Sequence, residues 1–187
     1  WLLPLLARLP YALAHKLAKW RGTVHAHLGR DWAELSVGMP YIAERTSRAA
    51  NLLWPQLDAA DIVKKRYQAI SREEWHANLL WRGHLEGLHC NLDALNNMLA
   101  KASPHKGLVV LTAHFDSFIV GMVGLGLCGR KTSVTTSNIY EHEQVHPAVS
   151  TFFDRKYRGA EKFLQGGKFM HVETSLRAFY RALSRKE

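Results

Sequence analysis

The chain has 187 residues, 47% of them hydrophobic, which is enough to bury one good core with a helical appendage. A formal net charge of +9 predicts an acidic partner, such as an anionic membrane, an acidic carrier protein or nucleic acid. The two cysteines match no C-x-x-C pattern, so the composition excludes a dense disulfide framework. The chain starts without a methionine, and we expect it to be a piece of a longer protein.

The first segment, residues 1–20, is rich in leucine and interrupted by prolines and cations. Pro4, Pro10 and the charges argue against a clean membrane span. We expect a membrane-proximal amphipathic helix that lies in the lipid interface, with its leucines toward the acyl chains and its cations toward the phosphates. A helix that docks on the rest of the domain is the alternative. The relevant cations are Arg8, Lys16 and Lys19.

A helical region is expected over residues 21–100. Ser71 and Glu74 have the spacing of a capping box just before "WHANLLW", which predicts that a helix starts there. The stretch "HLEGLHC" places His84 and His89 five apart, about 140° around a helix, so we interpret both as packing or surface residues.

From residue 101 to 187 the pattern changes to short apolar runs that alternate with helical ones. "GLVVLTA", "KTSVTTS" and "KFMHV" are typical of strands. "SFIVGMVGLGLCG" predicts a buried helix in which Gly121 and Gly124 allow close approach of a neighbour. A further helix is predicted from Pro147, its first residue, to a stop at Gly159.

The last stretch, "TSLRAFYRALSRKE", predicts an amphipathic helix. Its apolar positions are Leu176, Phe179, Tyr180 and Leu183, and its aligned cations are Arg177, Arg181 and Arg185. The alternation of strands and helices predicts an α/β fold: a helical N-terminal part followed by a mainly parallel sheet flanked by helices. We expect residues 101–187 to be the first part of that core, which is then incomplete.

His114 follows the apolar run "VVLTA", at the carboxyl end of a predicted strand. In open α/β sheets, reacting groups gather beyond that end of the strands. An imidazole there can take a proton from an attacking hydroxyl, and Asp116 is the nearest carboxylate to orient it. The alternative is that His114 is a turn residue and Asp116 caps the helix beginning near Ser117.

The block "GLVVLTAHFDSFIVGMVGLGLCGRK" resembles the bacterial lipid A late acyltransferases, the lauroyl/myristoyl transferase family with a glycerolipid acyltransferase-like fold. Looser similarity covers nearly the whole chain, including "LLARLPYALAHKLAKWRG" and "RAANLLWPQLDAADIVKKRYQAI". The resemblance implies transfer of a fatty acyl chain from acyl carrier protein or acyl-CoA to a lipid or glycolipid hydroxyl, without a cofactor. It makes His114, which Phe115 follows as in the family, the catalytic base. Asp116 is our candidate for the orienting carboxylate, and Phe115, Ser117 and Gly121 are our candidates for substrate binding.

Two departures distinguish this chain from the family pattern. In the family, four residues separate the histidine from an acidic residue. In this chain the corresponding position is Ile119. Where the family usually carries a Tyr-Arg-Pro-like stretch, residues 137–139 contain no arginine. The chain is therefore either an atypical transferase or a non-catalytic lipid- or carrier-binding relative.

A second motif offers different chemistry. His142, Glu143 and His146 form an H-E-x-x-H pattern, which on a helix gives two zinc ligands and a general base. Pro147 disfavours helical backbone at His146, and we therefore expect no metal site here, with a zinc hydrolase through this motif as the lesser alternative function. If a third ligand were needed, the candidates would be Glu161 and Glu173.

The basic residues also allow nucleic-acid binding, but no recognition motif accompanies them. We expect no nucleic-acid partner, and place the chain at the cytoplasmic face of the bacterial inner membrane, peripheral or anchored through its N-terminus. The expected partners are an anionic membrane surface, an acyl carrier protein or acyl-CoA donor and a lipid acceptor. The basic clusters are Lys64–Arg66, Arg155–Arg158 and the arginines of the last helix.

Overall fold

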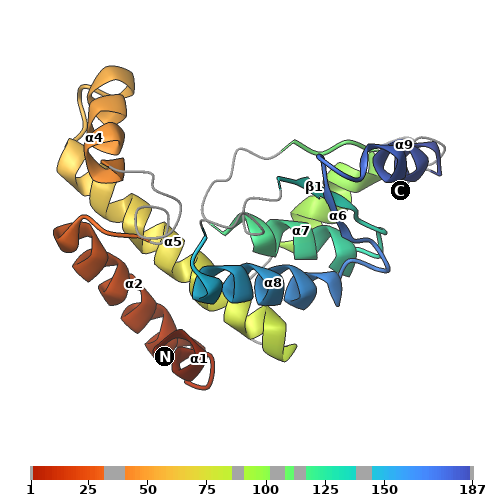
Figure 1. Cartoon of the computed structure of the whole chain (residues 1–187), viewed down its shortest axis with the longest axis horizontal. Helices are drawn as coiled ribbons and strands as arrows, with labels where there is room; N and C mark the ends of the chain where they lie inside the picture. Colours follow the sequence, from red (N-terminus) through yellow and green to blue (C-terminus); the bar gives the residue numbers. More distant parts are fainter. Residues whose placement is uncertain are drawn as a thin grey trace.

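The computed structural model of the protein describes residues 2–31, 41–85, 91–101, 108–111, 117–137 and 145–185. Within these ranges the protein is mostly helical and has one small parallel sheet (Figure 1). Among the described residues, none of the helices combines the length and the hydropathy that a membrane span requires.

The N-terminal half is built from helices, as predicted. α2 continues through residue 20, so the expected membrane-proximal segment is not separated from the helical region by a break. The long helix α5 (Ala59–Arg82) packs against α1, α2 and α4 and forms the centre of this half. The helices are α1 (Leu2–Leu6), α2 (Tyr11–Leu28), α4 (Ile42–Leu53), α5 (Ala59–Arg82) and α6 (Leu92–Ala100).

The start of α5 differs from the prediction. Asp58 caps the helix by accepting a hydrogen bond from a backbone N–H of the first turn, and Gly83 ends it in the left-handed conformation. The predicted capping box was wrong, because Ser71 and Glu74 lie in the middle of α5. Both side chains instead meet Arg21 of α2, whose Nη1 is 3.0 Å from Ser71 Oγ and forms an ion pair with Glu74.

α2 packs on α5 through small residues. Where the two helices are closest, a Cβ on Gly22 would lie 2.5 Å from the Cα of Gln68, so this position accepts only glycine without a shift. The apolar part of the interface is a buried cluster of Leu6, Ala7, Ala14, Ala18, Trp75 and Leu79. Alanines along one face of α2 allow the close contact that buries the Trp75 ring.

The C-terminal half contains the sheet. β1 and β2 are parallel, with Val134 opposite Phe169 and Thr136 opposite His171, and α8 connects them. The strands predicted in "KTSVTTS" and "KFMHV" are confirmed as β1 and β2, and the helix predicted from Pro147 is confirmed with Pro147 as its first residue. The elements are α7 (Phe118–Leu127), β1 (Val134–Thr136), α8 (Pro147–Glu161), β2 (Phe169–His171) and α9 (Leu176–Ser184).

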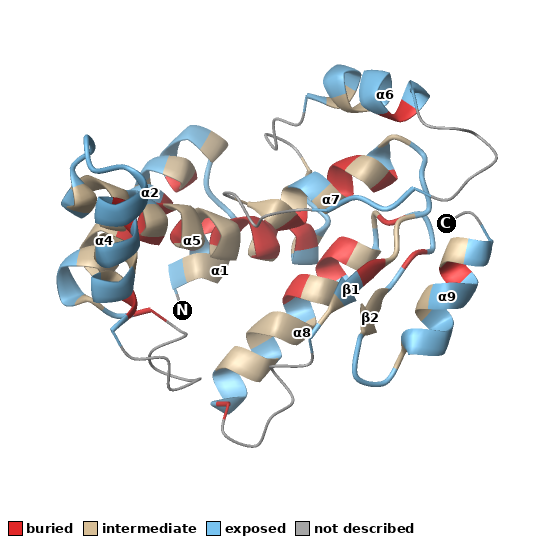
Figure 2. Cartoon of the chain, turned by 90° about the horizontal axis from the view of Figure 1, so that it is seen from above, coloured by how far each residue is buried: buried red, intermediate tan, exposed pale blue. Residues whose placement is uncertain are grey.

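A second buried cluster joins the two halves. It consists of Leu80 from α5, Ile119 and Val123 from α7, and Ala160 from α8. Figure 2 shows the buried residues gathered on α2, α5, α7 and α8, whereas α4, α6 and α9 are mostly exposed. α5 therefore contributes to both cores and holds α7 and α8 against the N-terminal helices.

The predicted strand "GLVVLTA" is not formed in its described part. Residues 108–111 are irregular and exposed, with Leu111 91% exposed. An apolar run becomes a buried strand only where a neighbouring strand pairs with it, and in the described residues the sheet contains β1 and β2 alone. The coarse prediction of parallel strands flanked by helices holds, whereas the larger sheet is not seen in these ranges.

The prediction that Gly159 stops its helix was wrong. α8 continues to Glu161, and Gly159 is buried where α8 crosses α5. A Cβ at this position would lie 2.7 Å from the backbone N of Trp81. The glycine is needed for close approach of two helices, which a sequence pattern cannot distinguish from a helix end.

Candidate functional site

Of the block that carries the resemblance, the structure describes residues 108–111 and 117–131. His114, Phe115 and Asp116 lie outside the described residues. α7 begins at Phe118, so its N-cap position falls on Ser117 and not on Asp116, although the Ser117 side chain makes no cap bond. The sequence places His114 four residues before the first residue of α7.

Beside the first turn of α7 lies a buried ion pair. The ammonium of Lys156, a residue only 6% exposed, bonds the carboxylate of Glu73 from α5. Its Nζ also stands 4.6 Å from the centre of the Phe118 ring and 5.4 Å from that of Phe153. Lysine is rarely buried unless paired, so this arrangement fixes a cation between α5, α7 and α8. No spacing rule could reveal a pair whose members are 83 residues apart.

The position of the family's acid is part of the hydrophobic core. Ile119 is 0% exposed and packs with Leu80, Val123 and Ala160. A carboxylate here would be cut off from water and could not be ionised without a large penalty. The chain therefore uses for packing a position that the family uses for an acid.

The prediction of close approach was wrong for Gly121. Gly121 is exposed, and a Cβ there would meet nothing within 4 Å, so this residue makes no close contact in the described structure. Gly124 is buried, and its close contact stays a prediction. Gly126 allows close approach, since its Cβ would lie 1.9 Å from the carbonyl oxygen of Phe163. The exposed Gly121 thus remains an available surface position and not a packing one.

Polar side chains meet at the carboxyl ends of the two strands, where open α/β sheets commonly bind ligands. Thr136 Oγ1 is 3.4 Å from the hydroxyl of Tyr157, and Ser137 Oγ donates to Glu173 over 2.7 Å. Burial raises the pKa of Tyr157, whose ring stacks on Phe169 at 4.4 Å. These groups were not predicted, because they come from three separate segments.

The possible zinc motif does not have a helical second half. His142 and Glu143 lie outside the described residues, and His146 has an extended backbone as the N-cap of α8. Its Nδ1 accepts a hydrogen bond from the backbone N–H of Ala148. Both proposed third ligands are engaged elsewhere: Glu161 accepts from the Phe169 backbone and Glu173 from Ser137. Within the described ranges, no group of three metal-ligating side chains is present.

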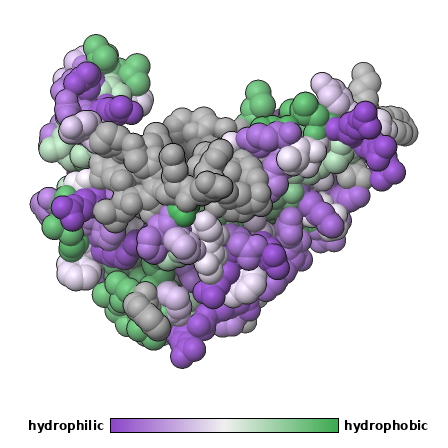
Figure 3. Space-filling model, viewed as in Figure 1, coloured by the Kyte–Doolittle hydropathy of each residue, from purple (hydrophilic) through white to green (hydrophobic). Residues whose placement is uncertain are grey.

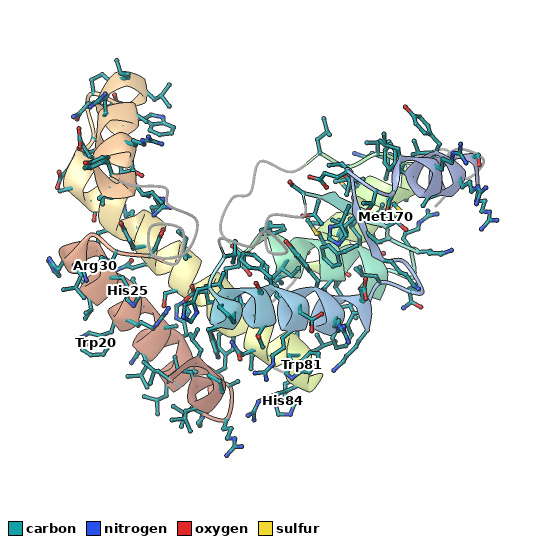
Figure 4. All side chains as sticks on the ribbon, viewed as in Figure 1. Trp20, His25, Arg30, Trp81, His84 and Met170 are labelled. Carbon is teal, nitrogen blue, oxygen red and sulfur yellow. The ribbon has the colours of Figure 1, made fainter. Side chains whose placement is uncertain are left out.

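The outer face of α1 and α2 combines leucines with cations. α2 is exposed on the side opposite its alanines, and Leu13 and Trp20, seven residues apart, lie about 20° from each other around the helix. Trp20 is 62% exposed and points away from α5 (Figure 4). Figure 3 shows a hydrophobic surface where α1 lies. The exposed apolar residues are Leu2, Leu5, Leu9, Leu13, Trp20 and Leu28.

The outer face of α1 and α2 also carries exposed cations. Arg8, Lys16 and Lys19 are exposed, and no ion pair within the described part of the chain involves them. The alternative of a docking helix is confirmed for one face, whereas contact of the other face with lipid stays a prediction. One face docks on α5, and the other leaves leucines and cations in solvent.

Most other basic clusters are neutralised locally. Lys64 and Lys65 pair with Asp61, and Arg66 pairs with the buried Asp31. In the cluster on α8, Arg158 pairs with Asp154. Such pairing is typical of solvated helix faces.

No family model, curated protein or solved structure matches the chain. Functional inference therefore rests on the residues and on their arrangement.

Proposed function

We propose that the chain is a peripheral-membrane acyltransferase with a glycerolipid acyltransferase-like core. It moves a fatty acyl chain from acyl carrier protein or acyl-CoA to a lipid or glycolipid hydroxyl. The observation that carries the proposal is the outer face of α1 and α2, where exposed leucines and Trp20 stand beside free cations. Such a face fits the boundary between lipid headgroups and acyl chains. The chemistry is taken from the resemblance around His114.

In the proposed reaction, the hydroxyl oxygen of the acceptor attacks the carbonyl carbon of the acyl thioester. His114 takes the hydroxyl proton as the new C–O bond forms. The C–S bond then breaks, and the thiolate leaves with the proton returned by the imidazolium. The products are an ester and a free thiol, with no oxidation or reduction.

Two features of the described residues support this assignment. The helix expected after the histidine is present as α7, with Ile119, Val123, Gly124 and Gly126 buried. Because Ile119 is buried in the core, the orienting carboxylate is assigned to Asp116, the nearest one in sequence. The net charge of +9 favours both an anionic membrane and an acidic carrier protein.

The second candidate function is a non-catalytic lipid- or carrier-binding relative. The observation in its favour is the same Ile119, because a chain that has replaced the family's acid with a core residue has lost one part of the usual chemistry. In this case the apolar outer face and the charge would still serve binding.

The membrane part is tested by flotation with vesicles of phosphatidylcholine and phosphatidylglycerol. Leu13→Asn/Trp20→Asn should weaken partitioning at least about tenfold, since a large buried apolar side chain contributes about 1.5–3 kcal/mol. Substitution is preferable to deletion, because removal of residues 1–20 would uncover Trp75 and Leu79. Unchanged flotation would show that this face does not contact lipid.

The chemical part is tested with labelled acyl carrier protein or acyl-CoA and a glycolipid acceptor. His114→Ala should reduce transfer by about 10²–10⁴-fold, the usual contribution of a general base. His84→Ala is the matched control, because His84 is exposed at the end of α5. If the wild type transfers no acyl chain from either donor yet still binds vesicles, the non-catalytic function replaces the enzymatic one.

A further inference from the structure

α9 is an amphipathic helix whose apolar side is only partly used for packing. Ala182 is buried and Phe179 is half-buried, whereas Leu176 and Tyr180 are 57% and 67% exposed. Around the helix, Tyr180 lies about 40° beyond Leu176, on the side away from Ala182. The helix thus rests on the protein through one edge of its apolar stripe and leaves the other edge in solvent.

The exposed edge of the stripe is bordered by arginines. Arg177, Arg181 and Arg185 follow each other at four-residue spacing, within about 80° of arc, and begin about 100° from Leu176. All three are exposed, and no ion pair in the described ranges involves them. The helix itself contains no acidic residue. An anionic partner that also accepts apolar side chains is complementary to this surface.

We infer that α9 is a second lipid-contact surface, which binds anionic phospholipid headgroups through its arginines and inserts Leu176 and Tyr180 between them. The inference rests on the proposed function only for the choice of lipid over another anionic partner. An interfacial helix needs an apolar stripe beside a cationic one, and α9 has both in solvent. The phosphates of a nucleic acid would bind the arginines, but they offer no apolar environment for Leu176. α9 lies at the opposite end of the molecule from α1 and α2 (Figure 1).

The tip between α4 and α5 provides a matched control surface. It is also apolar and exposed, with Leu52 and Leu53 at its end, but the neighbouring Arg48 and Lys65 are paired with Glu44 and Asp61, which leaves Arg45 as the nearby cation without an ion pair in the described ranges. One such cation beside exposed leucines should not select an anionic membrane as three arginines do. The pair Leu52→Asn/Leu53→Asn therefore removes two exposed apolar side chains without touching the proposed contact.

The experiment measures partitioning of the full chain onto phosphatidylcholine vesicles with and without phosphatidylglycerol. The triple change Arg177→Gln/Arg181→Gln/Arg185→Gln keeps good helix formers and should weaken binding to the anionic vesicles on the order of a hundredfold, about fivefold per arginine. Leu176→Asn/Tyr180→Asn should weaken it as well, and Leu52→Asn/Leu53→Asn should not. Hydrogen exchange of the α9 amides should slow when anionic vesicles are added to the wild type.

Three results would overturn the inference. The first is unchanged partitioning of the triple arginine variant. The second is concentration-dependent self-association of the wild type that Leu176→Asn/Tyr180→Asn abolishes without any effect on vesicle binding. The third is that duplex DNA displaces the protein from vesicles and that this displacement depends on the three arginines but on neither Leu176 nor Tyr180. None of these readouts depends on acyl transfer, so failure of the proposed reaction and failure of this inference are separate outcomes.

Discussion

Replacement of Ile119 by glutamate tests whether this position of α7 lies in the hydrophobic core, as described, or faces a water-filled pocket. The substitution restores the family's acid at a position that is 0% exposed. It removes a buried isoleucine, which costs about 2 kcal/mol. Keeping the new carboxyl protonated at pH 7 costs about 1.4 kcal/mol per pH unit above its usual pKa near 4.3, hence about 4 kcal/mol. The total of about 6 kcal/mol is comparable to the whole stability of a typical domain.

The sign of the pH dependence follows from the same numbers. Burial raises the pKa of this carboxyl in the folded state, so its penalty is small below pH 4.3 and grows as the pH rises. Urea unfolding followed by circular dichroism should therefore show Ile119→Glu to be about 3 kcal/mol less destabilised at pH 5 than at pH 7. Ile119→Val, which should cost about 0.5–1.5 kcal/mol at both pH values, is the control.

The reasoning is refuted if Ile119→Glu unfolds at the same urea concentration as the wild type at pH 7. Position 119 would then be accessible to water. A gain in acyl transfer in the same variant would mean that this position has the family geometry and merely lacks its carboxylate.

Three further predictions concern packing and charge. Gly126→Ala should destabilise the fold strongly in thermal unfolding, because its Cβ would collide with a backbone carbonyl, whereas Gly121→Ala on the exposed side of the same helix should stabilise by about 0.5–1 kcal/mol. Burial raises the pKa of Glu74 above its usual 4.5, so wild-type stability should fall as the pH rises from 4.5, and Glu74→Gln should flatten that curve in urea titrations. Lys156→Met should cost about 1–3 kcal/mol by leaving the partly buried Glu73 unpaired, and the added change Glu73→Leu should recover much of that loss; an equal cost for both variants would contradict the ion pair.

Local patterns predicted those elements whose residues determine them locally. Pro147 defines a helix start without help from distant residues, and the β-branched run of β1 favours a strand, which forms by pairing with β2. The capping-box pattern misled because Ser71 and Glu74 are bound by Arg21, which is distant in sequence. Gly159 misled for the same reason, since its role is set by the α5 backbone that crosses it.

The candidate site was less predictable than the elements. The sequence singles out His114 through its place after a predicted strand and through a resemblance, and Asp116 as the nearest carboxylate; both lie outside the described residues, so their roles stay predictions. The buried Lys156–Glu73 pair and the polar groups at the strand ends could not be predicted, because each joins residues from separate elements. Such groups are brought together only by the tertiary fold.

The alanine face of α2 has a mechanical consequence. A membrane anchor joined by a flexible linker lets its domain swing and sample many heights above the bilayer. Here the helix proposed to touch lipid is itself wedged against α5, with Gly22 at the point of closest contact. α5 in turn contacts α7 and α8. With α2 in the headgroups, as proposed, its depth would therefore set the distance between the lipid and the start of α7, because packed helices join the two.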